Sequence, residues 1–291
     1  MKKKKKANPV IVIFAIALVM VAVTIGVILM LGYRYKTLPN GAKFIGKSEN
    51  GQPVSGTIKY QDGGESELDY YARTIRFKNG DVYIGDIVNG CRDGNGIMQY
   101  SVTGDVYEGQ FRNDEISGSG VFKYAQGDVF TGNLLNGKKD GYGVFVYSNG
   151  NRYEGTFRDD VRSGQGKMYW ASGASYEGGF ENDLKNGAGI MIFESGSKYE
   201  GTFKNDMRDG DNCVYSFSNG ERYNGSFRNN LMDTRKVDEN GEFIKNEAGE
   251  YVHGDMAIYT FATGRTYRGY FVEGQALGVR IDSTTEEVPN S

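Results

Sequence analysis

Apolar and polar residues alternate in short segments along most of the chain, and this pattern predicts β-strands. In the segment 153–158, YEGTFR, the Tyr, Gly and Phe fall on one side of an extended strand and the Glu, Thr and Arg on the other. A turn at Asp159-Asp160 and a second strand over residues 166–170 complete a hairpin. Similar turns carry Asn-Gly, which supplies the positive φ values of a two-residue hairpin turn, at Asn79-Gly80, Asn149-Gly150 and Asn219-Gly220.

One long apolar segment precedes these strands. Residues 10–31 carry no charge and would reach about 33 Å as a helix, enough to cross the hydrocarbon core of a bilayer. A cleaved signal peptide would have an apolar region of about 7–15 residues and a small-residue cleavage site, and neither is present. The pattern predicts an uncleaved transmembrane helix between a cytoplasmic lysine-rich tail (1–9) and a linker (32–43).

The charges that flank this segment predict its orientation. Five lysines, residues 2–6, precede it, and fewer basic residues follow it, so we expect the N-terminus inside the cell and the remainder outside. The short lysine-rich start favours a bacterial protein of the cell membrane.

A Tyr-x-Gly motif returns about every 23 residues, which is the mark of a repeat array. Eleven residues after most motifs a glycine follows, commonly as Gly-x-Gly, as in Gly164-Gln165-Gly166. Because glycine weakens a strand, its recurrence predicts that neighbouring aromatic rings lie flat over bare backbone. The motifs begin at Tyr83, Tyr107, Phe130, Tyr153, Tyr176, Tyr199, Tyr223 and Tyr267.

The segments YEGTFRD at 153–159 and YEGQFRN at 107–113, each followed by Gly-x-Gly, resemble the membrane occupation and recognition nexus (MORN) repeat. The resemblance implies an elongated single-layer antiparallel sheet of successive β-hairpins over residues 83–280. The sequence departs from the motif at Asn212, where a second glycine is expected, and at an insertion over residues 231–253. We expect a degenerate leading repeat at 44–82 and a disordered acidic tail at 281–291.

Composition disfavours several classes of function. Beyond the five N-terminal lysines, 29 basic residues face 37 acidic ones, so the basic surface typical of nucleic-acid binding is missing. His253 is the single histidine, which excludes multi-histidine metal sites within one chain and leaves a catalytic triad one candidate base. We therefore expect no enzyme, no metal and no cofactor. Acidic residues of the insertion fit no calcium-loop spacing, and a surface loop, an extra hairpin or a partner contact remain open there.

The two cysteines are predicted not to pair within the chain. One hairpin advances a sheet by about 9–10 Å, which places Cys91 and Cys213 roughly 45 Å apart, far beyond disulfide range. Free thiols or pairing between molecules remain.

The aromatic side of the array is the predicted partner-binding face, because a single-layer sheet has no second layer to cover it. Mutual packing of the rings, a groove for a protein segment and self-association are the open alternatives. The predicted function is a membrane-anchored, non-enzymatic scaffold that binds a protein segment or a second copy; a phospholipid- or cell-surface-glycan-binding module is the alternative. The residues of this face are Tyr107, Phe111, Phe130, Tyr153, Phe157, Trp170, Tyr176, Phe180, Tyr199, Phe203 and Tyr223.

Overall fold

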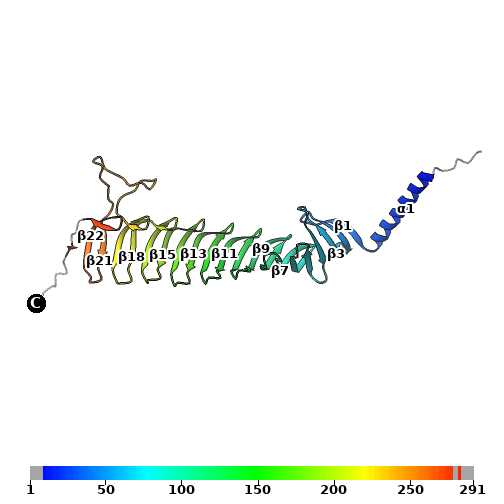
Figure 1. Ribbon diagram of the computed structural model, residues 1–291, viewed down its shortest axis with the longest axis horizontal. Helices are drawn as coiled ribbons and strands as arrows, with labels where there is room; N and C mark the ends of the chain where they lie inside the picture. Colours follow the sequence, from blue (N-terminus) through cyan, green and yellow to red (C-terminus); the bar gives the residue numbers. More distant parts are fainter. Residues whose placement is uncertain (1–8, 278–280, 283–291) are drawn as a thin grey trace, which may run out of the picture. The chain divides into compact units, whose positions relative to one another are not determined.

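The computed structural model describes residues 9–277 and 281–282. Over these residues it consists of one helix, α1 (Pro9–Met30), followed by strands and short turns (Figure 1). The chain divides into two compact units. Unit 1 comprises Met1–Gln126 and Leu134–Gly137, and unit 2 comprises Gly127–Asn133 and Lys138–Ser291.

In unit 1 each strand from β1 to β9 pairs antiparallel with the next along the chain. The predicted hairpin architecture is confirmed here. The strands are β1 (Tyr33–Thr37), β2 (Lys43–Glu49), β3 (Gln52–Lys59), β4 (Glu65–Asp69), β5 (Thr74–Phe77), β6 (Val82–Val88), β7 (Cys91–Gln99), β8 (Val106–Arg112) and β9 (Glu115–Lys123).

Unit 2 repeats the same antiparallel pairing from β11 onward, with short breaks where the sequence departs from the repeat. β10 (Val129–Leu135) contributes residues to both units. The other strands are β11 (Lys138–Val146), β12 (Arg152–Arg158), β13 (Val161–Tyr169), β14 (Ser175–Glu181), β15 (Leu184–Ile192), β16 (Lys198–Lys204), β17 (Met207–Arg208), β18 (Gly210–Ser216), β19 (Arg222–Arg228), β20 (Leu231–Met232), β21 (Ala257–Thr260), β22 (Thr266–Val272), β23 (Gln275–Leu277) and β24 (Ile281–Asp282).

Two kinds of turn alternate along the hairpins. The two-residue turns are formed by Asp and Asn or by a residue followed by Gly, and Asp159 and Asp160 both have positive φ, 47° and 73°. The three predicted Asn-Gly turns, at 79–80, 149–150 and 219–220, differ from the prediction: Tyr147 N–H, for example, bonds to Asn151 O and Gly150 N–H to Tyr147 O, which gives a three-residue loop. Gly150, at φ +86°, supplies the left-handed residue that ends such a loop.

The transmembrane prediction for residues 10–31 is not supported. No helix among the described residues is long and apolar enough to cross a membrane. The predicted cell-membrane location and orientation are not tested and stay predictions.

The structure also describes the predicted linker and the predicted leading repeat. The predicted linker 32–43 is wrong in part, because β1 lies within it and pairs with β2. In the leading region, Phe44 is fully buried and lies against Gly46, which pairs with Gly56, in the manner of a Tyr-x-Gly motif. Residues 1–8 of the lysine-rich tail and 283–291 of the acidic tail lie outside the described residues.

The insertion over residues 231–253 folds into two short loops that protrude from unit 2 (Figure 1). Asp238 Oδ1 accepts hydrogen bonds from the backbone of Asn240 and Glu242, and Asn246 Oδ1 accepts the same pair of bonds from Ala248 and Glu250. These Asx turns hold both loops. Isolated antiparallel bridges close the loops, in the manner of short hairpins, and partner contact through the insertion stays a prediction.

Candidate functional site

In most hairpins of the array the ring of the motif tyrosine or phenylalanine lies over a pair of facing glycines. Gly155 and Gly166 pair across β12 and β13, and a Cβ added at Gly166 would stand 2.5–2.7 Å from the ring and hydroxyl of Tyr153. Tyr153 also donates a hydrogen bond to the carbonyl of Thr156, 3.0 Å away. This carbonyl lies at the register shift between β12 and β13, so the hydrogen bond ties the tyrosine to the bulged part of its strand.

The motif phenylalanines join successive hairpins edge to face. The ring centroid of Phe180 lies 5.2 Å from that of Tyr176 in its own hairpin and 5.1 Å from that of Tyr153 in the preceding one, at interplanar angles of 83° and 86°. The same alternation continues in unit 2 as far as Phe271 and Tyr267. Edge-to-face pairs contribute about 0.5–1.5 kcal/mol each beyond the area they bury, so this ladder holds neighbouring hairpins together.

The sequence-predicted aromatic face is therefore brought together, but most of it is interior. Trp170 is half-buried, whereas the other ten of the eleven residues are at most 5% exposed. Such burial favours mutual packing and leaves little ring surface for a partner. The buried residues are Tyr107, Phe111, Phe130, Tyr153, Phe157, Tyr176, Phe180, Tyr199, Phe203 and Tyr223.

Trp170 belongs to a second aromatic row, the aromatic rim, that sequence analysis did not separate from the first. Each rim residue follows the end of a second strand and is half-buried, and each stands three residues before a turn glycine except Tyr100, which stands four residues before Gly104. That fixed spacing was the available signal. The rim consists of Tyr100 and Tyr124 in unit 1 and of Tyr147, Trp170, Phe193, Phe217 and Phe261 in unit 2.

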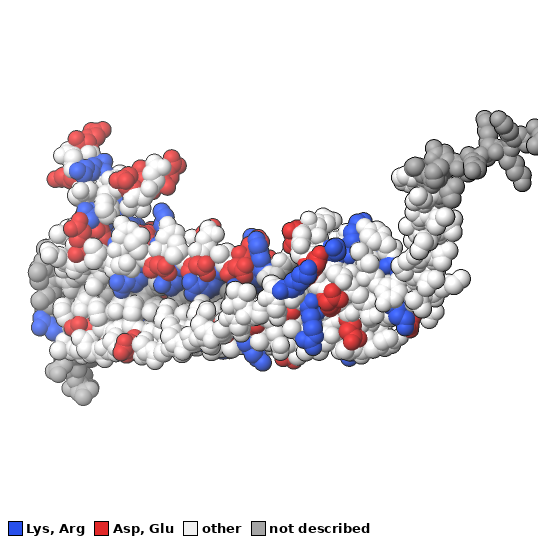
Figure 2. Space-filling view, turned by 45° about the vertical axis from the view of Figure 1, so that its right-hand side comes forward, with Lys and Arg blue, Asp and Glu red and all other residues white. Residues whose placement is uncertain are grey.

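The surface between the rim and the buried rings also carries a row of cations, again at equivalent positions. Lys185 Nζ lies 5.9 Å from the ring centroids of Trp170 and Tyr176, and the guanidinium carbon of Arg162 lies 5.3 Å from that of Phe180. Figure 2 shows positive and negative side chains in adjacent rows on this part of the molecule. The row comprises Arg92 in unit 1 and Lys139, Arg162, Lys185 and Arg208 in unit 2.

Each cation is tied to the turn of the following hairpin. Lys185 Nζ lies 2.8 Å from Asp206 Oδ1, and the backbone N–H of Lys185 donates to the same oxygen at 2.9 Å. Burial opposes ionisation of Asp206, but these two hydrogen bonds from Lys185 outweigh it and hold the pKa of Asp206 below its ordinary value. Burial lowers the pKa of Arg208, whose turn partner Asn230 carries no charge.

In unit 2 the rim and the cation row together line a surface that we call the aromatic trough. Rings, glycine backbone and paired charges can bind a ligand, but they offer no nucleophile with an adjacent base. Among the described residues, no group of three or more His, Cys, Asp or Glu side chains could hold a metal ion. Whether the chain is an enzyme is not tested by these observations.

The remaining candidates from the sequence are His253 and the two cysteines, and each contacts neighbouring residues of the fold. His253 Nδ1 lies 3.0 Å from Thr234 Oγ1, and its ring packs on Tyr270 at 4.6 Å. Both cysteines are free within the described part of the chain and at most 1% exposed, which disfavours pairing between molecules. Cys213, and not Asn212, stands opposite Gly225 in place of the second glycine, because a register shift follows Gly210.

Comparison with known proteins identifies the repeats. A family model for the MORN repeat matches residues 83–102, 107–129, 130–152, 153–175, 176–198 and 199–222. Beyond residue 222 the match stops, although the Tyr–Phe ladder continues through Tyr223 and Tyr267. No curated protein shows significant sequence similarity to the chain.

Two of the solved structures that match the chain are domains bound to peptides. The TCP10 domain of Danio rerio CPAP, in complex with a peptide of Danio rerio STIL, is 14% identical, with 87% of this chain and 99% of that chain covered and a TM-score of 0.40. The TCP domain of Drosophila melanogaster SAS-4, in complex with a proline-rich motif of Ana2, is 18% identical, with coverage of 59% and 90% and a TM-score of 0.32. These scores are too low to support an inference about function.

Proposed function

From the six MORN repeats in the chain, we propose that it is a non-enzymatic scaffold whose aromatic trough binds a segment of another protein. The observation that carries the proposal is the aromatic rim, which leaves part of each ring accessible at a regular interval while the rings beneath it are buried. Tyrosine and tryptophan offer large contact area at low entropic cost, and they are enriched where proteins bind one another.

The buried ladder supports this role because it fixes the geometry of the trough. Each rim ring follows a strand that is held by a Tyr–Phe ladder and by a cation bound to the next turn. A partner segment would therefore meet pre-positioned rings, and little conformational entropy would be lost on binding. Self-association through the same surface is the second form of this proposal.

Phospholipid and glycan binding remain the alternatives. The excess of acidic over basic residues outside the N-terminal lysines disfavours attraction to anionic headgroups. Flotation of the protein with anionic vesicles tests the lipid alternative, and retention on isolated cell-wall polysaccharide tests the glycan alternative.

Site-specific photocrosslinking in the native cell tests the proposal. A benzoylphenylalanine at Trp170 lies in the trough, whereas the same probe at Tyr169, a neighbour that is 40% exposed, points to the other face of β13. We expect one defined crosslinked protein from position 170 and none from position 169. Equal crosslinking from both positions, or crosslinks to lipid alone, would contradict the proposal, and a crosslinked dimer would identify self-association.

Fluorescence gives an independent measurement, because Trp170 is the single tryptophan of the chain. Binding of the crosslinked protein, once identified, should shield Trp170 and reduce its quenching by acrylamide. Replacement of Tyr147 and Phe193 by Ser should weaken this binding, and replacement of Tyr142 on the opposite face should not. Equal affinities for the two variants would contradict a trough site.

A further inference from the structure

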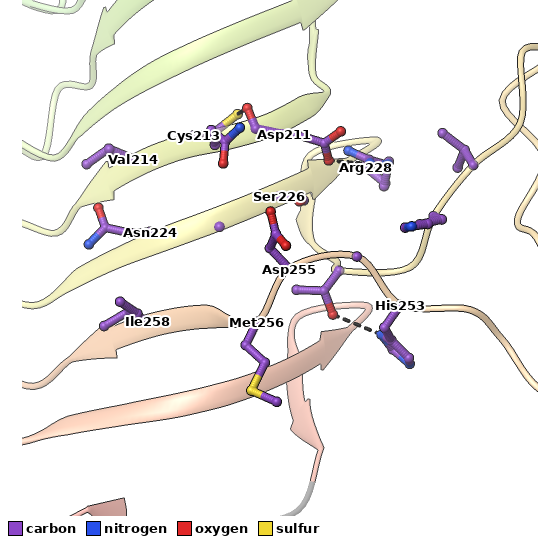
Figure 3. Close-up of a pocket in the computed structure, with 16 residues that line it drawn as sticks. Asp211, Cys213, Val214, Asn224, Ser226, Arg228, His253, Asp255, Met256 and Ile258 are labelled. Atoms are coloured by element: carbon purple, nitrogen blue, oxygen red, sulfur yellow. Dashed lines mark hydrogen bonds and ion pairs between the residues drawn. The ribbon is translucent and has the colours of Figure 1, made fainter.

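Unit 2 contains a pocket on its outer face, the face of the sheet opposite the aromatic trough. The pocket measures about 800 Å³ and lies between β18, β19 and the base of the insertion (Figure 3). Its volume is within the range of small-molecule sites. Asn212, Asn224, Ser226 and Thr234 contribute polar groups to its lining, and Met256 is among its apolar residues.

The floor of the pocket holds a buried arginine. Arg228 is 7% exposed, whereas the equivalent Arg158 in β12 is exposed. Arg228 Nη2 lies 2.6 Å from Asp211 Oδ1, and Nη1 donates to the carbonyl of Phe227 at 2.8 Å. Its Nε is buried and has no hydrogen-bond partner among the described residues. Because a buried charge is costly unless it is paired, this ion pair is a specific feature of the pocket and not a general property of the repeat.

The insertion supplies the opposite wall. Its base is fixed where Thr234 Oγ1 meets both His253 Nδ1 and the backbone of Phe271, each at 3.0 Å. Asp255 projects from this wall toward the strand that carries Ser226 (Figure 3). Asp255 and Lys236 are exposed, and within the described part of the chain neither side chain has a hydrogen bond or an ion pair, although Lys236 lies near enough to Asp211 to help lower its pKa.

The charges of the two walls favour one class of ligand. The floor of the pocket carries Arg228 and Asp211, and the wall formed by the insertion carries Lys236 and Asp255. Each of the two surfaces therefore has one positive and one negative side chain. A simple cation or anion would meet a like charge beside every opposite one, which is unfavourable, whereas a ligand with both charges can match both. Burial opposes ionisation of Asp211, but hydrogen bonds from Arg228 and Ser226 outweigh it and hold its pKa below the ordinary value.

We propose that this pocket binds a zwitterionic ligand of the amino-acid class, with its ammonium group at Asp255 and its carboxylate at Lys236. The source of such a ligand is a free amino acid or a short peptide, since both carry the two charges. Among the lining residues only His253 has a ring, so the stacking surface that sugar ligands commonly use is largely missing.

Calorimetric titration of the full chain tests the proposal. The probes are the common L-amino acids and L-alanyl-L-alanine, and the controls are ethylamine, acetate and N-acetyl-L-alanine amide. We expect at least one zwitterion to bind saturably at millimolar concentration or below, and the controls to bind at least about tenfold more weakly. Preference for the dipeptide would identify a peptide as the source. Absence of binding by every zwitterion, or equal binding of the controls, would overturn the proposal.

Variants locate the binding in the pocket. Asp255→Asn and Lys236→Gln should each weaken binding at least about tenfold, because each removes the charge opposite one ligand group. Arg158→Gln is the matched control on the same face outside the pocket, and it should leave the affinity unchanged, as should Trp170→Ser in the trough. Circular dichroism checks that all four variants fold. Unchanged binding by Asp255→Asn would overturn the assignment independently of whether the trough binds a protein.

Discussion

The guanidinium of Arg162 reaches the turn carboxylate of Asp183 in the following hairpin, with Nε and Oδ1 2.9 Å apart. The backbone N–H of Arg162 donates to the same oxygen at 2.9 Å, and Nη2 donates to the carbonyl of Asp183 at 2.6 Å. Asp183 also has a φ of 67°, which Asp and Asn tolerate better than other side chains. One turn residue thus provides the left-handed conformation and the link between two hairpins.

This double role predicts a graded response at Asp183. Asp183→Asn keeps the acceptor oxygen and the tolerance for positive φ, and Asn230 already occupies the equivalent place opposite Arg208, so we expect a loss of about 1 kcal/mol or less. Asp183→Ala removes the acceptor and strains the backbone, with an expected loss of about 2–3 kcal/mol. Urea unfolding of both variants measures these values. Equal losses would contradict the role of the side-chain oxygen.

The two glycines beneath each tyrosine are predicted to differ in their tolerance of a methyl group. A Cβ at Gly155 would stand 2.6 Å from Gly166 Cα and 2.8 Å from the carbonyl oxygen of Gln165, so backbone would have to move. At Gly166 the nearest atoms all belong to the Tyr153 ring and hydroxyl, which can shift.

Natural variation in the chain agrees with this difference. Cys213 and Ala257 occupy the second glycine position opposite Gly225 and Gly269. We therefore expect Gly166→Ala to lower the free energy of unfolding by about 1–2 kcal/mol and Gly155→Ala by about 3 kcal/mol or more. Thermal and urea unfolding compare the two variants, and an equal or reversed order would contradict the backbone contact.

The lowered pKa of Asp206 predicts a loss of stability in acid. A carboxyl whose folded-state pKa is depressed stabilises the fold above its unfolded value, near 3.8, and this contribution disappears as the pH falls through the lower folded value. Asp206→Asn should therefore flatten the dependence of unfolding free energy on pH below about 4, with little change in slope above about pH 5. Parallel urea titrations at several pH values test this. Asp159, which is exposed in its turn, provides the control position for the same substitution.

Much of the fold could be predicted from the sequence because the repeat fixes both strand alternation and turn position. The placement of Tyr153 over Gly155 and Gly166 follows directly from their positions on one face of two paired strands. The length of the Asn-Gly turns did not follow, since Asn149-Gly150 is compatible with loops of two or three residues. The bulge that brings Cys213 opposite Gly225 does not alter the spacing of the motif, so it could not be predicted from the sequence.

The candidate surface was harder to predict. The second strand was predicted to begin at residue 166, whereas β13 begins at Val161. Arg162 therefore lay outside the predicted strand, and the cation row was not predicted. Burial of Tyr153 and Phe157 depends on edge contacts with neighbouring hairpins, which a single repeat does not reveal. The insertion lacks the repeat pattern altogether, and its pocket with Arg228 arises only from the tertiary fold.

The ion pair between Arg235 and Asp233 is predicted to hold the insertion in place. Arg235 Nη2 lies 2.6 Å from Asp233 Oδ2, and the two side chains are 4% and 2% exposed. The guanidinium carbon also lies 3.7 Å from the ring centroid of Phe243. Arg235→Met leaves the buried carboxylate without its charged partner, which costs about 3–5 kcal/mol, and it should release residues 233–256 to rapid hydrogen exchange. Lys245→Met, which alters an exposed contact with Tyr251, is the matched control, and equal exchange in both variants would contradict this role.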